Sequence, residues 1–341
     1  MKEIKKKYYL TAIVVCLIAI IVLTYNYLMG SFSASDDTQY VYIDNDDNID
    51  SVCAKLEPIG SEPRIMAFQT LSRHFDYPEH IRTGKYAIQP DESTITVFRH
   101  LKNGYQEPLK LTIPESRTIE KLAGSLSRRL MVDSISLTDS LKDAAFCKSL
   151  GYDTATIVCM FVPNTYEVYW NTSIGHLMQR MKKEHDQFWN GERTAKAKNI
   201  GLTSNEVCTV ASIIDEETAN NGEKPMIAGM YLNRLKINMP LQADPTIKFA
   251  LRDFALKRIY HNMLLIDSPY NTYRNTGLPP GPIKIASVAG IDAVLNRVDH
   301  NYLYMCAKED FSGTHNFAKT YQEHLKNAAK YSKALNERGI K

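Results

Sequence analysis

The first strong pattern along the chain is an uncharged, mostly apolar run from Tyr8 to Leu28. A helix rises about 1.5 Å per residue, so this run is long enough to cross a hydrocarbon core of about 30 Å. We therefore expect a transmembrane helix at 8–28, preceded by a short basic tail at 1–7 and followed by a polar tether at 29–39.

The charges on either side of this run predict its orientation. The tail before it carries Lys2, Lys5, Lys6 and Lys7, whereas 31–50 holds acidic residues and no basic ones. Because lysine is retained on the cytoplasmic side, we expect a single-pass protein of the cytoplasmic (inner) membrane with its N-terminus inside. Everything after about Gly30 would then be periplasmic or otherwise extracytoplasmic. The main alternative is a cleaved signal peptide, for which SFSAS at 31–35 is the nearest approach to a cleavage site.

Alternating and helical patterns after the tether predict a small α+β module at 40–105. A strand at 40–43 is followed by two helical stretches and by a second strand at 84–88. A further helix starts after Ser93, a favourable N-cap residue, and ends at Gly104. The expected order is strand, helix, helix, strand, helix.

The rest of the chain, 106–341, predicts a larger mixed α/β domain. Strands are expected at 109–113 and 301–308, and long helices at 174–190, 285–298 and 321–335. Taken with the module and the apolar N-terminal run, these elements give the whole chain an α+β fold class.

A helix that starts at Thr203 organises this larger domain. The Thr203 hydroxyl can accept a hydrogen bond from the amide of Glu206, while the Glu206 carboxylate reaches back to the Thr203 amide, which is a capping box. Apolar residues then recur at i, i+3, i+4 and i+7, the spacing of one buried stripe. These residues are Val207, Val210, Ala211 and Ile214.

Three consecutive carboxylates end this helix. On the helical wheel Glu216 points nearly opposite the apolar stripe, into solvent, whereas Glu217 lies at one edge of the stripe and Asp215 flanks the other. A carboxyl group in partly apolar surroundings has a raised pKa and can hold a proton near neutrality. Glu217 is therefore the candidate general acid, and the alternative is an ordinary solvated helix end.

A helix at 225–235, and another that begins near Asp244, meet at a polar loop. Asp244 is expected as the N-cap and Pro245 as the first helical residue. Gln242 and Asp244 are then expected to line a groove around Glu217.

The loop at 268–283 is expected to form one wall of this groove. Its prolines enforce extended backbone and its glycines allow sharp turns. Its expected substrate contacts are Tyr270, Asn271 and Thr272. The further binding candidates are Asp215, Asn233 and the lone histidine His315.

Five separated segments carry a family pattern. They are ASIIDEET at 211–218, AGMYLNRL at 228–235, LQADPT at 241–246, SPYNTYRNTGLPPGPI at 268–283 and GTHNF at 313–317. In this order they resemble the YceG-like family of MltG-type endolytic murein transglycosylases. Carried over by position, the family's catalytic glutamate falls on Glu217, and the module at 40–105 is similar to the family's LysM-like module. Asn164 replaces an aspartate of the family, so we expect this position to hold a turn or to hydrogen-bond the substrate.

The resemblance implies cleavage, without water, of the β-1,4 bond between N-acetylmuramic acid and N-acetylglucosamine in nascent peptidoglycan. Glu217 would protonate the leaving oxygen and then take the proton of the C6 hydroxyl, which closes a 1,6-anhydro ring. Such a cut terminates strand elongation and needs no metal and no organic cofactor. The implied partners are peptidoglycan glycan strands and, as candidates, peptidoglycan synthases.

Two other functions use the same residues. A lysozyme-type hydrolase needs two carboxylates that flank one bond, but Asp215 and Glu217 point to different sides of the helix. A non-catalytic, membrane-anchored peptidoglycan-binding scaffold would use the groove without cleavage. The products separate the three functions as anhydro ends, reducing ends or no cleavage.

Composition and residue spacing argue against two kinds of ligand, nucleic acid and metal. A net charge of +3 gives no argument for nucleic acid as a partner. The six cysteines lack a C-x-x-C spacing, and His300, His315 and His324 do not complete a recognisable set of metal ligands. We expect most of the cysteines to be small buried side chains and leave a single disulfide as an alternative.

Overall fold

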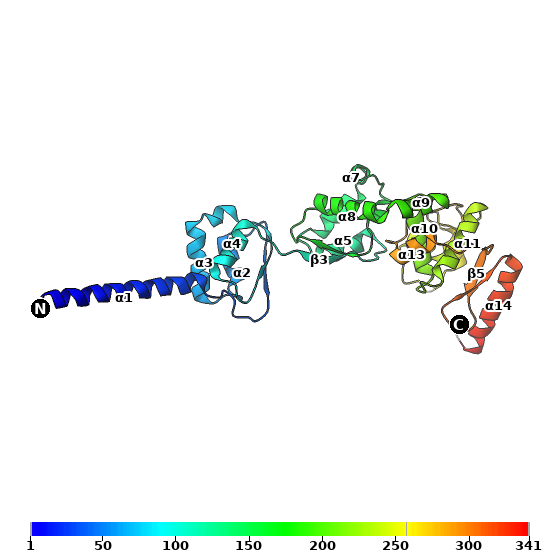
Figure 1. Cartoon of the computed structure of the whole chain (residues 1–341). Coiled ribbons are helices and arrows are strands. Elements are labelled where there is room, and N and C mark those ends of the chain that lie inside the picture. Colours follow the sequence, from blue (N-terminus) through cyan, green and yellow to red (C-terminus); the bar gives the residue numbers. More distant parts are fainter. Residues whose placement is uncertain (1, 257, 340–341) are drawn as a thin grey trace. The chain divides into compact units, whose positions relative to one another are not determined.

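The computed structural model describes residues 2–256 and 258–339 of the chain (Figure 1). These residues form two compact units. Unit 1 comprises Met1–Lys110, Arg129–Met131 and Glu167–Thr172, and unit 2 comprises Leu111–Arg128, Val132–Tyr166 and Ser173–Lys341. Helices and short antiparallel strands occur in both units, so the expected mixed α+β class is confirmed.

Unit 1 begins with the long helix α1 (Lys2–Met29). Its segment Lys6–Met29 has 24 residues and a mean hydropathy of 2.4, and none of it is buried. At about 1.5 Å per residue this segment is about 36 Å long, more than the hydrocarbon thickness of a bilayer. The expected N-terminal helix is therefore confirmed as one long and apolar enough to cross a membrane.

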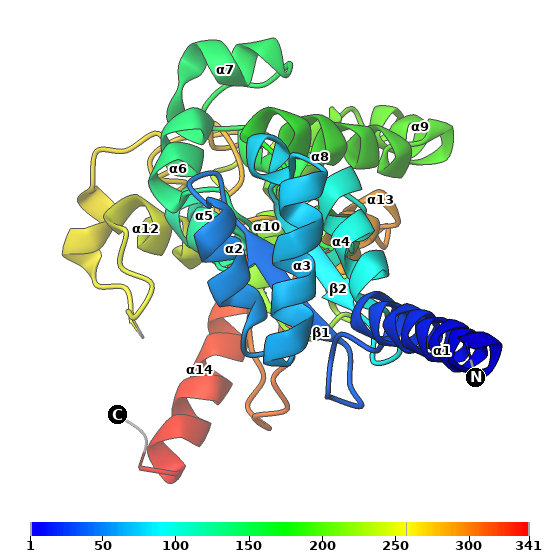
Figure 2. The same cartoon turned by 90° about the vertical axis from the view of Figure 1, so that its left-hand side faces the viewer.

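The rest of unit 1 is a small α+β module. Strands β1 (Gln39–Ile43) and β2 (Gly84–Ile88) pair antiparallel. Around this pair lie α2 (Ile49–Leu56), α3 (Glu62–His74), the 3-10 helix η1 (Tyr77–His80) and α4 (Thr94–Asn103) (Figure 2). The predicted order of strand, two helices, strand and helix is confirmed.

Aromatic rings fill the centre of this module. Phe68, Tyr77 and Phe98 meet edge to face, with ring centroids 5.8–5.9 Å apart. Helix α4 has the two caps expected from the sequence: Ser93 accepts from the amide of Thr96, and Gly104 ends the helix with a φ of 75°. A left-handed φ is one that glycine adopts without steric cost.

Unit 2 is mainly helical. Strand β3 (Leu109–Thr112) pairs with β4 (Thr165–Val168), and β5 (Tyr304–Ala307) pairs with β6 (His315–Ala318). The first helices are α5 (Ile119–Ser127), α6 (Ser134–Lys142), α7 (Ala144–Ser149), η2 (Ile157–Met160), α8 (Ile174–Phe188) and α9 (Gly191–Asn199). The later ones are α10 (Ser204–Glu217), α11 (Lys224–Lys236), α12 (Asp244–Leu251), η3 (His261–Leu265), α13 (Val288–Leu295) and α14 (Tyr321–Glu337).

Several element boundaries differ from the prediction. Ala243, rather than Asp244, is the N-cap of α12, because the Asp244 carboxylate accepts a hydrogen bond from the Tyr273 hydroxyl instead of capping the helix. Helix α13 begins at Val288 rather than at 285, because Ser287 caps it. Strands β4 and β6 were not predicted, and each is only four residues long.

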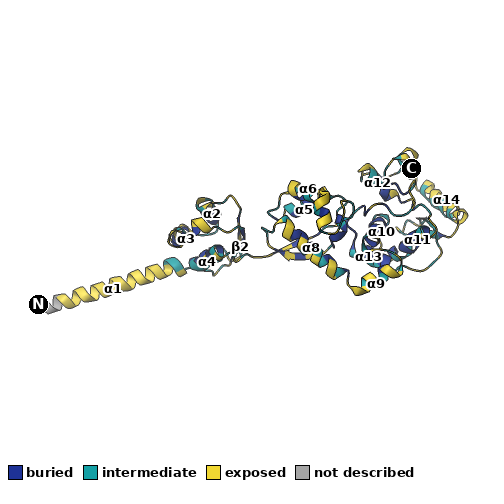
Figure 3. Cartoon of the chain, turned by 90° about the horizontal axis from the view of Figure 1, so that it is seen from above, coloured by how far each residue is buried: buried dark blue, intermediate teal, exposed yellow. Residues whose placement is uncertain are grey.

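Helix α10 is the centre of unit 2 and begins with the predicted Thr203–Glu206 capping box. Every residue from Val207 to Ile214 is buried, where the wheel predicted one apolar stripe. Helices α9, α11, α12 and α13 pack around it (Figure 3). The buried Ser212 hydroxyl donates to the Thr209 carbonyl and accepts from the Ile283 amide, so this polar group has partners without water.

A buried ion pair joins the end of α10 to α11 and α13. Lys224 Nζ lies 2.7 Å from Asp215 Oδ1, and the two side chains are only 7% and 2% exposed. The amide and the hydroxyl of Ser287 each donate to Asp215 at 2.7 Å. A Cβ on Gly290, in the first turn of α13, would lie 2.6 Å from the same carboxylate. The first turn of α13 therefore packs directly on Asp215.

We expect Asp215→Asn to destabilise the protein strongly. Removal of one partner of a buried ion pair leaves the Lys224 ammonium uncompensated, which costs about 3–5 kcal/mol of the free energy of unfolding. This loss is measured by urea unfolding of the full chain in detergent, with tryptophan fluorescence as the readout. The matched control is Asp292→Asn on α13. The Asp292 side chain forms an ion pair with Arg193 and is 41% exposed, so loss of this ion pair should lower the free energy of unfolding by less than about 1 kcal/mol. Equal stability of the two variants would contradict the structural role of Asp215.

Candidate active site

The last turn of α10 borders a cavity of about 250 Å³ in unit 2. The other walls come from α11, the segment before α12, the loop at 268–283 and the β5–β6 pair. The polar lining residues are Glu217, Tyr231, Arg234, Gln242, Asp244, Tyr273 and His315. Four of the site residues expected from the sequence therefore meet here, namely Glu217, Gln242, Asp244 and His315.

Glu217 is the last residue of α10 and is partly exposed in the wall of this cavity. Its Oε1 accepts a hydrogen bond of 2.8 Å from the Tyr231 hydroxyl. Burial raises the pKa of Glu217 to about 7. The hydrogen bond from Tyr231 and the nearby basic groups lower this pKa, while the negative charge of Asp244 adds to the rise. A carboxyl group with such a pKa can both donate and accept a proton near neutral pH.

Tyr231 and Arg234 reach the cavity from consecutive turns of α11. Both are buried. The Arg234 guanidinium donates to the carbonyls of Leu241 and Leu303, each at 2.6 Å. Since these carbonyls belong to the segment before α12 and to the residue before β5, Arg234 fixes two further walls of the cavity relative to Tyr231.

His315, at the start of β6, is held by a buried carboxylate. Its Nδ1 lies 2.9 Å from Glu223 Oε2, and its amide donates to Glu223 Oε1 at 2.6 Å. Because a carboxylate accepts, the Nδ1 atom of His315 carries the hydrogen in this contact. Nε2 is then the ring nitrogen left to contact a ligand.

Asp244 and Tyr273 form a second polar pair in the cavity, with the Tyr273 hydroxyl donating to Asp244 Oδ1 at 2.5 Å. The neighbouring Gln242 has a φ of 51°, which is uncommon for a residue with a side chain. Its amide donates to the Thr272 carbonyl, and the next amide, that of Ala243, donates to the Thr272 hydroxyl. Thr272 thus holds Gln242 at the cavity without lining the cavity itself.

Two other residues expected to contact the substrate donate their side-chain hydrogen bonds to backbone carbonyls instead. Asn233 donates to the carbonyls of His300 and Tyr302 at 2.6 and 3.2 Å. Asn271 is fully buried and donates to the carbonyls of Leu264 and Ile266. Both amides therefore shape loops. Neither residue lines the 250 Å³ cavity.

The two remaining candidates also lie outside this cavity. The Asp215 carboxylate accepts hydrogen bonds from Lys224 and Ser287. Tyr270 lines a different cavity and packs on Phe249, with ring centroids 4.6 Å apart. The structure therefore divides the predicted set into a group at Glu217 and a group that supports the surrounding loops.

The prediction that Glu216 faces solvent is wrong. Arg117 donates to both oxygens of its carboxylate at 2.8–3.1 Å, and Lys284 lies 3.6 Å away. The Glu216 side chain is consequently only 14% exposed. The helical wheel could not indicate this, because Arg117 is 99 residues away in the sequence.

Asn164 lies in the bend just before β4, and its polar groups bind the backbone. Its side-chain oxygen accepts from the Thr165 amide at 2.8 Å, and its carbonyl accepts from the Ile113 amide at 2.9 Å. Both contacts lie at the start of the β3–β4 pair.

Four residues of the site were not singled out from the sequence: Tyr231, Arg234, Tyr273 and Glu223. Tyr231 shares one face of α11 with Ile227 and Met230, a pattern that indicates packing. The signal that could have identified Tyr231 is a polar tip on an otherwise apolar face, because a buried tyrosine hydroxyl usually has a partner. Glu223 lies in a polar turn and gave no signal.

The cysteines are free thiols, and Cys53, Cys147, Cys159 and Cys208 are buried, as expected for most of them. Within 2–256 and 258–339, no group of three His, Cys, Asp or Glu side chains is placed to hold a metal ion.

Comparison with known proteins adds to this geometry. Residues 41–330 match the sequence profile of the YceG-like family. A Bacillus subtilis protein named endolytic murein transglycosylase is 29% identical over 306 residues, which cover 85% of this chain and 83% of that protein. A Streptococcus pneumoniae protein of the same name is 27% identical, and the match covers 90% of this chain and 61% of that longer protein.

A solved structure is also similar. The crystal structure of a putative YceG-like protein from Listeria monocytogenes superposes with a TM-score of 0.55 at 26% identity, covering 86% of this chain and 99% of that one. The profile match spans most of the chain, including every residue assigned above to the 250 Å³ cavity. This chain therefore belongs to the YceG-like family.

Proposed function

We propose that this protein is a membrane-anchored lytic transglycosylase that cuts peptidoglycan glycan strands internally, with Glu217 as its catalytic acid and base. One observation carries the proposal: the Glu217 carboxyl group borders a cavity and has a pKa of about 7 because of burial. It also accepts a hydrogen bond from the neutral Tyr231 hydroxyl. The names of the two similar proteins support the same activity.

In the first step, protonated Glu217 donates its proton to the oxygen that links N-acetylmuramic acid to N-acetylglucosamine. The bond from C1 of the muramic acid to this oxygen breaks, and positive charge develops at C1. The Asp244 carboxylate lines the same cavity, and its negative charge favours this transition state.

In the second step, the Glu217 carboxylate takes the proton of the C6 hydroxyl of the same muramic acid. The freed oxygen bonds to C1, which yields a 1,6-anhydro ring and returns Glu217 to its protonated form. One group can perform both steps because its pKa lies near the working pH. The Tyr231 hydroxyl stabilises the carboxylate between the two steps.

A hydrolase of lysozyme type is a second candidate, and one observation favours it. Asp215 cannot supply the second carboxylate, since it is buried in its ion pair, but Asp244 lies in the cavity with Glu217. In a hydrolase Asp244 would activate water or attack C1. Reducing ends rather than anhydro ends would then form.

The placement of the chain follows from its N-terminus. We place 1–7 in the cytoplasm, 8–28 in the cytoplasmic membrane, the 29–39 tether and the LysM-like module at 40–105 outside it, and the catalytic domain at 106–341. A domain held in this way lies close to nascent glycan, so its cuts would terminate strand elongation beside the peptidoglycan synthases.

The first test is the substitution Glu217→Gln in the full chain in detergent. We expect kcat to fall by about 10²–10⁴, because the amide keeps the shape of the side chain but cannot donate the proton. Mass spectrometry of digested glycan strands measures anhydro ends, and the wild type should produce these rather than reducing ends. The control is Glu192→Gln, a carboxylate that is 74% exposed, which should keep full activity.

Stability provides a check that Glu217→Gln still folds. The folded state disfavours ionised Glu217, so the wild type loses stability as the pH rises from about 4.5 towards 7. The variant has no ionisable group at this position and does not lose stability in this way, so its Tm should equal or exceed that of the wild type above pH 7. More than a tenth of the wild-type activity in a folded variant would remove Glu217 from the mechanism.

The pH profile tests the role of Tyr231. The general acid must be protonated, so kcat/KM should fall above about pH 7. The Tyr231 hydrogen bond lowers the pKa of Glu217, so Tyr231→Phe should move this alkaline limb to higher pH. Tyr302→Phe is the control and should leave the limb in place. An unmoved limb in Tyr231→Phe would contradict the assignment of the limb to Glu217.

The orientation is tested in cells. Translocation of the N-terminal lysines is costly, so the N-terminus should stay in the cytoplasm and the C-terminal domain should lie outside it. A reporter that is active only outside the cytoplasm, fused after Lys341, should report, and protease added to spheroplasts should degrade the domain. A protected domain with a reporter that works only in the cytoplasm would exclude a cell-wall substrate.

A further inference from the structure

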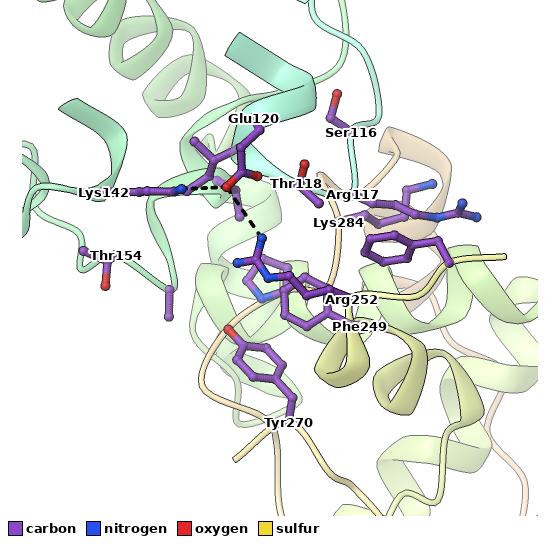
Figure 4. Close-up of a pocket in the computed structure, with 15 residues that line it drawn as sticks. Ser116, Arg117, Thr118, Glu120, Lys142, Thr154, Phe249, Arg252, Tyr270 and Lys284 are labelled. Atoms are coloured by element: carbon purple, nitrogen blue, oxygen red, sulfur yellow. Dashed lines mark ion pairs between the residues drawn. The ribbon is translucent and has the colours of Figure 1, made fainter. Parts of the chain in front are cut away.

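A second cavity, of about 280 Å³, lies in unit 2 and is not used by the mechanism above (Figure 4). It lies between the start of α5, the end of α6, the segment before η2 and the C-terminal end of α12. Figure 4 shows Arg252, Phe249 and Tyr270 opposite Glu120 and Lys142. Its volume is close to the lower end of the range for small-molecule sites, about 300 Å³, so it can take one or two side chains of a ligand rather than a whole large molecule.

The side chains around this cavity favour an anionic ligand. Its cationic lining residues are Arg117, Lys142, Arg252 and Lys284, against one carboxylate, Glu120. The hydrogen bond from Lys142 lowers the pKa of Glu120 to about 2, so Glu120 stays ionised. Three of the cations have close acidic partners, at 2.6–2.9 Å, in Glu216, Glu120 and Glu115.

Arg252 has the weakest of these ion pairs. Its Nη1 lies 3.5 Å from a Glu120 oxygen that Lys142 already holds at 2.6 Å, and its side chain is 68% exposed. A guanidinium has five N–H donors in a planar fork that fits a carboxylate. Arg252 can therefore bind a second carboxylate while Glu120 keeps its contact with Lys142.

The backbone of Arg252 supports this interpretation. Arg252 ends α12 in the left-handed region, with a φ of 53°, a position where glycine or asparagine is favoured. An arginine there has a backbone cost of about 1 kcal/mol. The conformation places the guanidinium at the cavity beside Glu120 (Figure 4).

Aromatic side chains form the part of the wall next to Arg252 (Figure 4). The Phe249 ring packs against Tyr270 at 4.6 Å and against Phe254 at 6.4 Å between centroids. These surfaces suit small aliphatic groups, which gain free energy when they leave water. The cavity thus matches a ligand that combines carboxylates with short aliphatic side chains, as an acidic peptide does.

The second cavity lies one short helix away from the first. Asp244, at the start of α12, lines the cavity of Glu217, and Phe249 and Arg252, at its end, line the second. The eight residues of α12 span about 12 Å. An extended peptide covers about 3.3–3.6 Å per residue, so three or four residues bridge this distance.

A small third cavity lies along the same helix. It has a volume of about 30 Å³ and includes Glu216 and Pro245 together with Phe249 and Phe254 of the second cavity. Concave surface therefore continues from the acidic end of α10 towards Arg252.

We propose that the second cavity is a subsite for the stem peptide of the substrate, the short acidic peptide linked to the lactyl group of muramic acid, and that Arg252 binds one of its carboxylates. This inference rests on the proposed function. With a muramic acid in the cavity of Glu217, its peptide follows α12 to the second cavity. Arg252 is then a specificity residue that distinguishes peptide-bearing strands from naked glycan.

The test uses the full chain in detergent and two matched substrates. One is uncross-linked glycan that carries its stem peptides, and the other is the same glycan after an amidase has removed them. We expect the wild type to cut the peptide-bearing strands with about tenfold higher kcat/KM, the factor expected for one charge-assisted hydrogen-bonded contact. Arg252→Asn should lose this preference and retain the wild-type kcat/KM on naked strands.

Asparagine is chosen because it tolerates the left-handed backbone, so the variant keeps its fold. The control is Arg128→Asn, which removes the same charge from an exposed position outside the cavity and should behave as the wild type. A wild type without preference, or an Arg252→Asn variant with equal losses on both substrates, would overturn the subsite.

Calorimetric binding of a synthetic stem tetrapeptide separates this inference from the proposed function. Arg252→Asn should weaken binding about tenfold, and amidation of the peptide carboxylates should do the same to the wild type. Inorganic phosphate at the same concentration should not displace the peptide; displacement would indicate a general anion site and overturn the assignment. Failure to form anhydro ends from either glycan would refute the proposed function, whereas equal binding by wild type and variant would refute the subsite alone.

Discussion

Three adjacent carboxylates at the end of a buried helix impose the constraint on which this site depends. Asp215, Glu216 and Glu217 end α10, whose preceding two turns are entirely buried. A carboxylate that leaves water needs a partner, or it keeps its proton. Asp215 has Lys224, Glu216 has Arg117, and Glu217 has the neutral hydroxyl of Tyr231. The last of the three is therefore the one whose pKa rises to about 7.

The two ionised neighbours keep this arrangement in place. Asp215 joins α10 to α11 through Lys224 and to α13 through Ser287, and α11 is the helix that carries Tyr231. The same ion pair that stabilises the fold thus fixes the group that hydrogen-bonds Glu217. Arg234, on the next turn of α11, extends this rigid frame to the segment before α12 through the Leu241 carbonyl. Preorganisation of this kind limits the movement needed when charge develops on a substrate.

Local patterns in the sequence predicted most helices and the partly apolar surroundings of Glu217, because capping and apolar spacing act over a few residues. The Thr203 capping box and the position of Glu217 at the edge of a stripe are of this kind. The partners of the neighbouring carboxylates are not local: Ser287 is 72 residues from Asp215, and Arg117 is 99 residues from Glu216. The side-chain amide of Asn271 was expected to contact substrate. It instead donates hydrogen bonds to two backbone carbonyls, which would otherwise lack a partner within the loop.

Helix α12 explains how two charged sites of opposite sign can lie close together. Asp244 is at its N-terminal end and Arg252 at its C-terminal end, and the helix dipole stabilises a negative charge at the first and a positive charge at the second. Each charge is thus favoured by the helix that carries it, while the helix separates the two by about 12 Å. A substrate with a cationic transition state at one point and a carboxylate a few residues away would meet matching charges at both ends of one rigid element. With the proposed subsite, recognition of the peptide and orientation of the sugar over Glu217 would be coupled through α12 rather than through a flexible loop.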